Sequence, residues 1–506
     1  MLVDSIMDRN YILDRKKNIL KSMMAYGVSV YISQIIGFFV SIFLRRFLGP
    51  FYMGVWSLVR VIIDYSLYTH VGTANAMYYK VPLYNGKGEK EEADTVQNVV
   101  FSFLLVTSIP VILCMLIAAF ILKGRISDEL FVGLLILPLI FLGQRFYTYF
   151  VMLLRANKKF TLLGKSYIID SIINLLLVFL LVYKFKLYGM YAASVLLVIF
   201  NLLYIQYNAR FRLRFMLVWG KIKDYIVFGF PIFVASFLNV MLYSIDRLMI
   251  AKMLGMVPLG YYSIAIMSRS YTIGASKSFA SVISPYFIED YGKTEDVLYT
   301  RKYILTYTEI IACIMAVILG CVYIVFPVFV DYVIPKFQPG INSMKAMLFS
   351  TFFMIVSGLW ENFLVVKNRQ IVLVITSISA IIMNIILNYI LIKMHFNITG
   401  VAMASSFTTF FVFITFSILG MYYLENIKGF FLFFIRVLTP LVLITLEVLL
   451  IERFVYFANP ILECLIRLFV FLICSIGIAF YINRRTGAVN IIIDILRDKF
   501  IKSKSV

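Results

Sequence analysis

The chain is a succession of long apolar runs separated by short polar breaks. Hydrophobic residues make up 62% of its 506 positions, charged residues 14%, and mean hydropathy is +0.93, far outside the range of soluble domains. A helix that crosses a bilayer needs roughly 20 apolar residues, and about fourteen such runs can be counted. Because an open sheet cannot satisfy its backbone in lipid, we expect an all-α polytopic membrane protein. The runs begin near Met24, Met53, Val96, Phe131, Thr161, Tyr188, Ile226, Leu259, Ile304, Ile341, Ile371, Ile398, Phe430 and Ile461.

A motif in the breaks occurs twice and indicates an internal duplication. Its two copies, 206 residues apart, share a leucine–glycine pair, a second glycine, an aromatic ring and a serine. They are Leu48-Gly49 with Gly54, Trp56 and Ser57, and Leu254-Gly255 with Gly260, Tyr262 and Ser263. A second pair of similar segments has an offset of 211 residues: 189–194 and 400–405. Chance recurrence of glycine is the alternative, but two echoes at nearly one offset favour duplication, which is typical of transporters.

The repeat predicts how the chain is organised. Six spans separate the two copies, an even number, so both halves cross the membrane in the same direction. We therefore expect two six-helix lobes related by a parallel internal repeat, plus two extra C-terminal helices. The expected segments are an N-lobe at 1–207, a basic cytoplasmic linker at 208–225, a C-lobe at 226–424, two further spans at 425–482 and a basic tail at 483–506.

The net charge of +21 is scattered over many short loops. If the N-terminus is inside, cytoplasmic segments hold about thirty of the 47 basic residues, which places both termini in the cytoplasm. Anionic membrane lipids are the expected partners of this charge, and its scatter argues against nucleic acid. The five cysteines and two histidines lack metal-ligand spacing, and no phosphate-binding loop is present. We expect no cofactor and no ATP-driven mechanism.

Four basic residues inside spans are candidates for binding an anionic substrate, because charge in a span usually faces a cavity or a partner. Arg60 lies in the second span, and Arg269 lies in the corresponding span of the other half. Lys277, two turns beyond Arg269, and Arg145 in the fourth span complete the set. Two arginines on a common axis would suit a phosphate group, which guanidinium binds through paired hydrogen bonds. The alternatives are a salt bridge from Arg60 to Asp64 and snorkelling of Arg145 to the interface.

Three acids and one proline are candidates for coupling and movement. Asp64, Asp170 in the fifth span and Glu361 in the tenth could carry a proton or ligate sodium, with structural pairing as the alternative. Pro231 interrupts the seventh span near its inner end, where the missing backbone hydrogen bond predicts a hinge. Near the outer end of that span, Asp246-Arg247 indicates an interfacial ion pair.

Most of the 34 tyrosines are expected to pack or to lie at the membrane interfaces. Four of them follow closely on Arg60 and could instead line a path for sugars. These four are Tyr65, Tyr68, Tyr78 and Tyr79.

The segments around the seventh span resemble those of a known family. The similar segments are Phe228-Gly-Phe-Pro231, Ser244-Ile-Asp-Arg247, and Leu254-Gly255 through Leu259-Gly260-Tyr261-Tyr262-Ser263. They resemble the Wzx-type polysaccharide flippases of the multidrug/oligosaccharidyl-lipid/polysaccharide (MOP) exporter superfamily. The stretch from Arg45-Arg46 to Trp56-Ser57 is similar to the opening of the same family, and the resemblance covers the whole chain.

This resemblance implies a transporter of polysaccharide biosynthesis rather than an enzyme. Its cargo would be an undecaprenyl-pyrophosphate-linked oligosaccharide for O-antigen, lipopolysaccharide or capsule, moved from the cytoplasmic to the outer leaflet of the bacterial inner membrane. The implied mechanism is alternating access through a cationic central cavity, coupled to an H⁺ or Na⁺ gradient. Polysaccharide polymerase and chain-length machinery are candidate partners. The related lipid II flippases carry arginines in the first, second and eighth helices. Arg60 and Arg269 match the latter two, but residues 25–44 contain no arginine, which disfavours lipid II as cargo.

Three other readings remain open. A drug or organic cation antiporter of the same superfamily would share the fold but is expected to have an acidic cavity. An O-antigen ligase or polymerase would need a long outer loop, whereas the longest expected outer loops have about ten residues. A membrane scaffold would give no reason for Arg60 and Arg269 inside spans.

Overall fold

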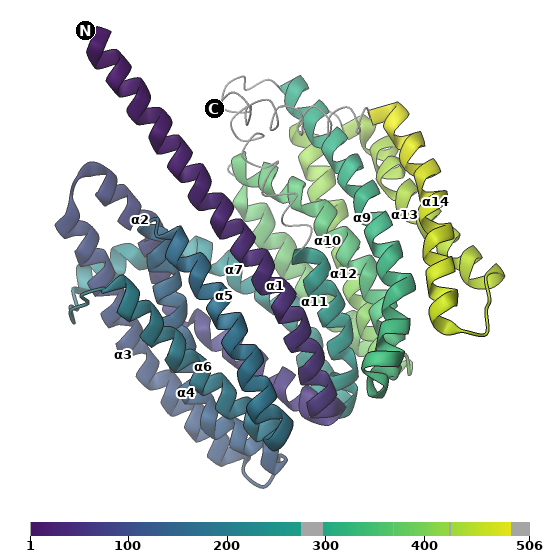
Figure 1. The fold of residues 1–506 in the computed structure, drawn as a ribbon, viewed down its shortest axis with the longest axis horizontal. Helices are drawn as coiled ribbons and strands as arrows, with labels where there is room; N and C mark the ends of the chain where they lie inside the picture. The colour runs from purple at the N-terminus through teal and green to yellow at the C-terminus, as the bar shows by residue number, and fades with distance from the viewer. Residues whose placement is uncertain (1, 275–296, 368, 425–426, 487–506) are drawn as a thin grey trace. The chain divides into compact units, whose positions relative to one another are not determined.

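The computed structural model describes residues 2–274, 297–367, 369–424 and 427–486 (Figure 1). These parts of the chain consist of helices joined by short turns and contain no strand, which confirms the expected all-α class. Internal contacts divide the chain into two compact units. The first is Met1–Ala251 with Gly255–Gly260, and the second is Lys252–Leu254 with Tyr261–Val506.

The first unit contains six long helices, most of a seventh, and two short helical segments. They are α1 (Leu2–Leu67), η1 (Tyr68–His70), α2 (Thr73–Lys87), α3 (Lys90–Leu122), α4 (Asp128–Ala156), α5 (Phe160–Leu177), η2 (Val178–Val182), α6 (Tyr183–Ala209) and α7 (Trp219–Met253). The second unit contains the remaining long helices and two short helical segments. They are α9 (Val297–Val333), η3 (Pro335–Gly340), α10 (Ile341–Val366), α11 (Gln370–Lys393), α12 (Asn397–Tyr423), η4 (Ile427–Gly429), α13 (Phe430–Phe454) and α14 (Pro460–Thr486). Residues 256–274 are also helical.

Many helices carry a face of exposed apolar side chains. On α3, four such residues recur every fourth position and are more than half exposed: Ile109, Leu113, Ile117 and Ile121. A stripe of this kind would be unfavourable in water and is typical of a lipid-facing helix. Eleven helices in the described parts of the chain are long and apolar enough to cross a membrane. The protein is therefore a multi-pass membrane protein.

Two of these eleven segments are interrupted. Tyr26–His70 has 45 residues and contains a break at Gly49 (φ 72°), and Phe160–Ala209 has 50 residues and contains one at Lys186 (φ 52°). At about 1.5 Å per residue, each is more than twice as long as the roughly 30 Å hydrocarbon core. Each segment therefore has the length of two spans. The total of fourteen spans stays a prediction.

The repeated glycine motif has a structural reason. Gly49 and Gly255 both adopt left-handed backbone conformations, with φ of 72° and 98°, which L-residues with side chains rarely adopt. Gly54 and Gly260 approach the opposite copy of the motif reciprocally. A Cβ on Gly54 would lie 2.8 Å from the carbonyl carbon of Met256, and one on Gly260 would lie 2.8 Å from the Cα of Pro50. The motif is therefore a self-complementary backbone contact inside the first unit.

The segment between α6 and α7 is held against α3. Residues 210–218 are not helical, and the backbone N–H groups of Arg214 and Met216 donate to two side chains of α3. The acceptors are Asn98 Oδ1 at 2.8 Å and Ser102 Oγ at 2.7 Å. The sequence predicts a linker at 208–225, and in the structure the last part of this range, from Trp219 on, belongs to α7. The proposed lobe boundaries stay predictions, because they follow the sequence repeat and not the contact units.

Candidate functional site: an ion cluster and an aromatic wall

Three charged side chains in the first unit form what we call the Asp64 ion cluster: Arg60, Asp64 and Arg247. The Arg60 Nε lies 3.2 Å from Asp64 Oδ1, and the Arg247 Nη2 lies 3.9 Å from Asp64 Oδ2. Arg60 and Asp64 share one face of α1 because they are four residues apart, whereas Arg247 comes from α7. The expected alternative for Arg60, a salt bridge to Asp64, is therefore present. The Arg60 side chain nevertheless remains 42% exposed, so this pair also presents a guanidinium to its surroundings.

Directly after Asp64 in the chain, the end of the second expected span packs antiparallel to α7. The Ser244 hydroxyl donates to the Tyr65 hydroxyl at 2.7 Å. The Tyr65 ring lies 6.0 Å from that of Phe237, and the Tyr68 ring lies 6.2 Å from Phe233 and 5.6 Å from Phe237. Phe233 and Phe237 are stacked on each other, with centroids 5.8 Å apart. We call Tyr65, Tyr68, Phe233 and Phe237 the aromatic wall.

Arg145 contacts Thr69, the residue after Tyr68, and is buried, with 2% of its surface exposed. Its guanidinium donates to the hydroxyls of Thr69 and of Thr107, the latter at 2.5 Å, and lies 5.4 Å from the centre of the Phe141 ring. Its Nε has no hydrogen-bond partner in the described part of the chain. Arg145 therefore joins α4, α3 and η1 from inside the bundle, and the expectation that it binds substrate stays untested.

Pro231 lies within α7, which continues as one helix from Trp219 to Met253. Two residues earlier, Gly229 meets the backbone of Gly72, which follows η1. A Cβ on Gly229 would lie 2.6 Å from the carbonyl carbon of Gly72, so only glycine allows this approach. The proline thus lies two residues from the glycine that contacts the break of the second expected span, and its role as a hinge stays a prediction.

The acidic candidates are not gathered in one place within the first unit. Asp64 belongs to the ion cluster, whereas Asp170 on α5 accepts a hydrogen bond from Asn201 on α6. In the second unit, Glu361 is half-buried on α10. No group of three potential metal ligands is found among the residues that the structure describes.

Arg269 in the second unit is buried and lies on the helical stretch 256–274. Its Nη1 approaches the Met347 sulfur of α10 at 3.8 Å. Lys277, the remaining basic candidate, lies outside the described residues.

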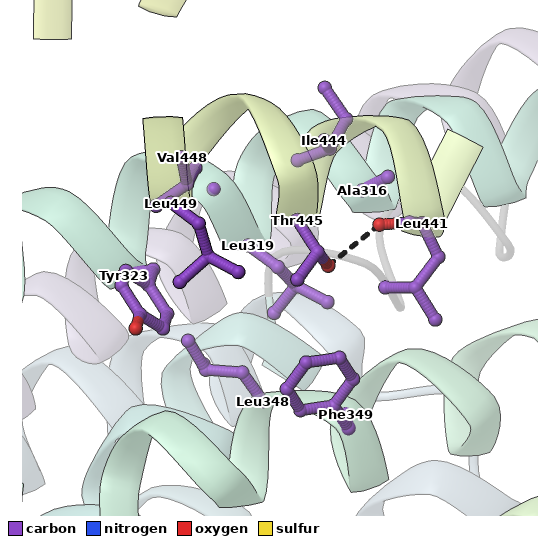
Figure 2. A pocket seen from close by; sticks show the side chains of 11 residues that line it. Ala316, Leu319, Tyr323, Leu348, Phe349, Leu441, Ile444, Thr445, Val448 and Leu449 are labelled. Carbon is purple, nitrogen blue, oxygen red and sulfur yellow. Dashed lines mark hydrogen bonds between the residues drawn. The ribbon is translucent and has the colours of Figure 1, made fainter. Parts of the chain in front are cut away.

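A separate apolar cavity of about 230 Å³ lies between α9, α10 and α13 in the second unit (Figure 2). Its lining includes Leu319, Leu348, Leu441 and Val448, together with Tyr323. Next to Tyr323, a salt bridge of 2.8 Å joins Lys345 to Glu452. None of the residues that the sequence predicts as site residues lines this cavity.

Sequence reasoning missed two contributors to the site, Arg247 and Ser244. The sequence indicates an interfacial pair of Asp246 with Arg247, which stays a prediction, and the structure places Arg247 beside Asp64 as well. A signal was available: Ser244 and Arg247 are three residues apart and so share a face of α7. Which helix that face meets cannot be read from spacing alone.

Comparison with known proteins assigns the family and the fold. The family model described as "Polysaccharide biosynthesis protein" matches residues 43–336. No curated protein matches the chain in sequence.

Among solved structures, a lipid II flippase MurJ in an inward closed conformation is similar, with a TM-score of 0.66 and 16% identity, over 91% of this chain and 99% of that one. An inward-facing multidrug resistance MATE transporter of the MOP superfamily has a TM-score of 0.62 and 16% identity, over 80% and 95%. A MOP superfamily transporter from Pyrococcus furiosus has a TM-score of 0.56 and 14% identity, over 81% and 96%. The chain belongs to the polysaccharide biosynthesis protein family and has the fold of the MOP superfamily transporters.

Proposed function

We propose that the protein is a flippase for an undecaprenyl-pyrophosphate-linked oligosaccharide. It moves this lipid from the cytoplasmic to the outer leaflet of a bacterial inner membrane by alternating access. The observation that carries the proposal is that the Asp64 ion cluster lies beside the aromatic wall. The proposed cargo has the same two parts, because its anionic pyrophosphate is linked directly to sugars. The family description and the fold of MOP transporters support this class of substrate.

The ion cluster suits a pyrophosphate because it contains two guanidinium groups and one carboxylate. Arg60 and Arg247 both contact Asp64, so each arginine has a counter-charge in the empty state. A pyrophosphate offers oxygens that match the planar fork of arginine. The partial exposure of Arg60 leaves its guanidinium available for such a contact.

Arg269 is proposed as the second arginine that holds the same headgroup. It lies in the second copy of the repeat, on the span that corresponds to the span of Arg60. Lys277 and Arg145 complete the proposed cationic surface. In this scheme Pro231 lets α7 bend as access alternates.

The aromatic wall is proposed as the surface along which sugars pass. Tyr65 and Tyr68 contact phenylalanines of α7, and Tyr78 and Tyr79 are exposed, with ring centres 5.2 Å apart. Rings with a polar edge combine apolar contact with hydrogen bonding, which suits the mixed faces of a sugar.

Coupling to an ion gradient is proposed for the acids. Asp170 with Asn201, Asp64 in the ion cluster, and Glu361 could each bind H⁺ or Na⁺. Anionic lipids, the polymerase and the chain-length machinery remain the proposed partners.

An organic cation antiporter is the second candidate, because the MATE transporters share the fold. The ion cluster argues against it, since two arginines around one acid repel a cation. An enzyme such as a ligase is disfavoured by the short turns between the described helices, for instance residues 455–459 between α13 and α14.

The proposal is tested in cells whose surface glycan depends on this protein. Arg60→Ala/Arg269→Ala at wild-type abundance should abolish surface glycan and leave lipid-linked oligosaccharide on the cytoplasmic side. Arg269→Lys should impair export less than Arg269→Ala, because lysine keeps the charge but loses the fork. The matched control is Arg46→Ala, an exposed arginine on α1 that should leave export unchanged. Normal export by the double variant would contradict the proposal.

A further inference from the structure

The second expected span is broken at residues 68–72, and the break has an ordered backbone. After α1 ends at Leu67, the turn η1 leads to Val71 and Gly72, which both have left-handed conformations with φ of 47° and 89°. A valine rarely adopts this conformation, since its Cβ is crowded there. Something must therefore hold the break in place.

One restraint on the backbone of the break is a hydrogen bond to the side chain of His70. The backbone N–H of Gly72 donates to His70 Nδ1 at 2.9 Å. The geometry is that of an Asx turn, in which a side chain accepts from the N–H two residues on. A ring nitrogen accepts a hydrogen bond only when it carries no proton, and both nitrogens of an imidazolium are donors. This conformation of the break therefore requires His70 Nδ1 to be proton-free.

The groups that face His70 come from α4, from α7 and from its own segment. From α4, Arg145 donates to Thr69, the residue that precedes His70. From α7 the ring faces Phe233, with centroids 6.0 Å apart, and from its own segment it faces Tyr68 at 5.9 Å. The α3 contact to Arg145 is Thr107, a neutral hydroxyl. A proton on His70 would thus place a second cation beside Arg145 with an aromatic ring and a phenol as its other neighbours.

The break is connected to α7 through the backbone. A Cβ on Gly72 would lie 2.6 Å from the carbonyl oxygen of Gly229, so the two chains touch without side chains between them. The Thr73 hydroxyl donates to the His70 carbonyl at 2.9 Å and ties the start of α2 to the same turn. A change at His70 therefore reaches α2 and α7 directly.

We propose that His70 Nδ1 is the binding site of a coupling proton. In the conformation described, the Gly72 N–H occupies the lone pair and excludes the proton. When the break rearranges and the N–H leaves, Nδ1 takes up H⁺ and loses its role as acceptor. A ligand that binds one of two conformations shifts the equilibrium toward it, so proton uptake and rearrangement of the second span drive each other. The inference rests on the proposed function and deepens it, because it assigns H⁺ and not Na⁺ to this site.

The first test uses the fact that the chain has only two histidines, His70 and His395. NMR of protein labelled at histidine in nanodiscs should give two signals whose protonation can be followed with pH. Hydrogen exchange of the Gly72 amide is measured in parallel and corrected for its intrinsic pH dependence. Protonation of His70 should coincide with loss of protection at Gly72. A Gly72 amide that stays protected after His70 is protonated would overturn the proposal, and so would a His70 that takes up no proton down to the acid limit of folding.

His70→Asn is the informative variant, because an asparagine oxygen can accept from Gly72 N–H but cannot take up a proton near neutral pH. Its Gly72 amide should stay protected as pH falls, whereas His70→Ala should lose protection at every pH. His395→Asn, the matched control, should retain the wild-type response. A pH response in His70→Asn equal to that of the wild type would show that another group is responsible.

The second test separates this inference from the proposed function. In proteoliposomes loaded with undecaprenyl-pyrophosphate-linked oligosaccharide, a pH gradient should raise translocation several-fold in wild type and in His395→Asn. The ratio with and without the gradient should fall to near one in His70→Asn. An equal ratio in wild type and in His70→Asn would refute the role of His70 but would leave the proposed flippase function unaffected. Absence of translocation in every protein would refute the flippase, while the NMR and exchange results would still decide whether His70 controls the break.

Discussion

At the scale of single residues, charged side chains from two helices gather around Asp64. The Asp64 carboxylate pairs with Arg60 of α1, at 3.2 Å from Nε to Oδ1, and with Arg247 of α7, at 3.9 Å from Nη2 to Oδ2. Partly exposed ion pairs contribute little to stability, typically about 0–1 kcal/mol. The cluster is therefore better explained as a site that positions guanidinium groups for a ligand than as a contact that stabilises the fold.

Arg247→Ala tests this interpretation. Without Arg247, Asp64 is left to Arg60 alone and neutralises the guanidinium that should meet the pyrophosphate. We expect the translocation rate to fall by about tenfold, which corresponds to ~1.4 kcal/mol of transition-state stabilisation. Thermal stability in detergent should change little. Lys252→Ala, an exposed basic residue at the end of the same helix, is the control and should leave the rate unchanged.

The stability measurement decides between the two roles of Arg247. If the variant unfolds at a much lower temperature and loses activity only in proportion, Arg247 is a structural residue. If the rate falls in a protein that is as stable as wild type, Arg247 acts on the substrate.

At the scale of helices, glycine decides where chains approach. The pairs Gly72 with Gly229, and Gly54 with Gly260, bring backbone against backbone at two levels of the first unit. A third glycine of α7, Gly220, has nothing within 4 Å of the position that a Cβ would take. The same helix therefore offers one glycine that is required for packing and one that is not.

Gly229→Ala and Gly220→Ala form a matched pair of variants. The Gly229 variant should push α7 away from Gly72, with a loss of about 1–3 kcal/mol in the free energy of unfolding and a marked loss of translocation. The Gly220 variant should be neutral or more stable, because alanine favours helix over glycine by up to about 1 kcal/mol. Thermal unfolding in one detergent compares them. Equal melting temperatures would show that the close approach at Gly72 is not required.

At the scale of the whole molecule, composition was sufficient to predict the class. Long apolar runs leave helices as the only option for the spans, and the described parts of the chain are helical without a strand. The repeated glycines were also readable, since Gly49 and Gly255 recur because both must take a left-handed backbone.

Other features could not be read from sequence, for physical reasons. The break at 68–72 carries no proline and no run of polar residues, and it is stabilised by a histidine and by a distant arginine, Arg145. The contact of Arg247 with Asp64 joins two helices, and a sequence shows neighbours along one helix but not neighbours across helices. The contacts of the buried Arg145 with hydroxyls of other helices likewise cannot be read from spacing along its own helix.

The topology of the whole chain is tested by cysteine labelling. In a background without the five native cysteines, single cysteines at 123–129 and 334–340 should react with an impermeant reagent added from outside. Cysteines at 85–92 and 485–505 should react only after the membrane is permeabilised, because the basic segments are expected to be cytoplasmic. Reaction of the C-terminal positions from outside would overturn the fourteen-span arrangement with both termini inside.

We propose that Arg60 and Arg269 together hold the pyrophosphate of a lipid-linked oligosaccharide during its movement between leaflets. The direct measurement is translocation by purified protein in proteoliposomes that contain undecaprenyl-pyrophosphate-linked oligosaccharide with a labelled sugar. Periodate that cannot cross the membrane reports the fraction of sugar on the outer side over time. Wild type and Arg46→Ala should expose the sugar at equal rates. Arg60→Ala/Arg269→Ala should be slower by about a hundredfold, if each arginine contributes about tenfold independently. A double variant that stays folded and translocates the lipid at the wild-type rate would contradict the account.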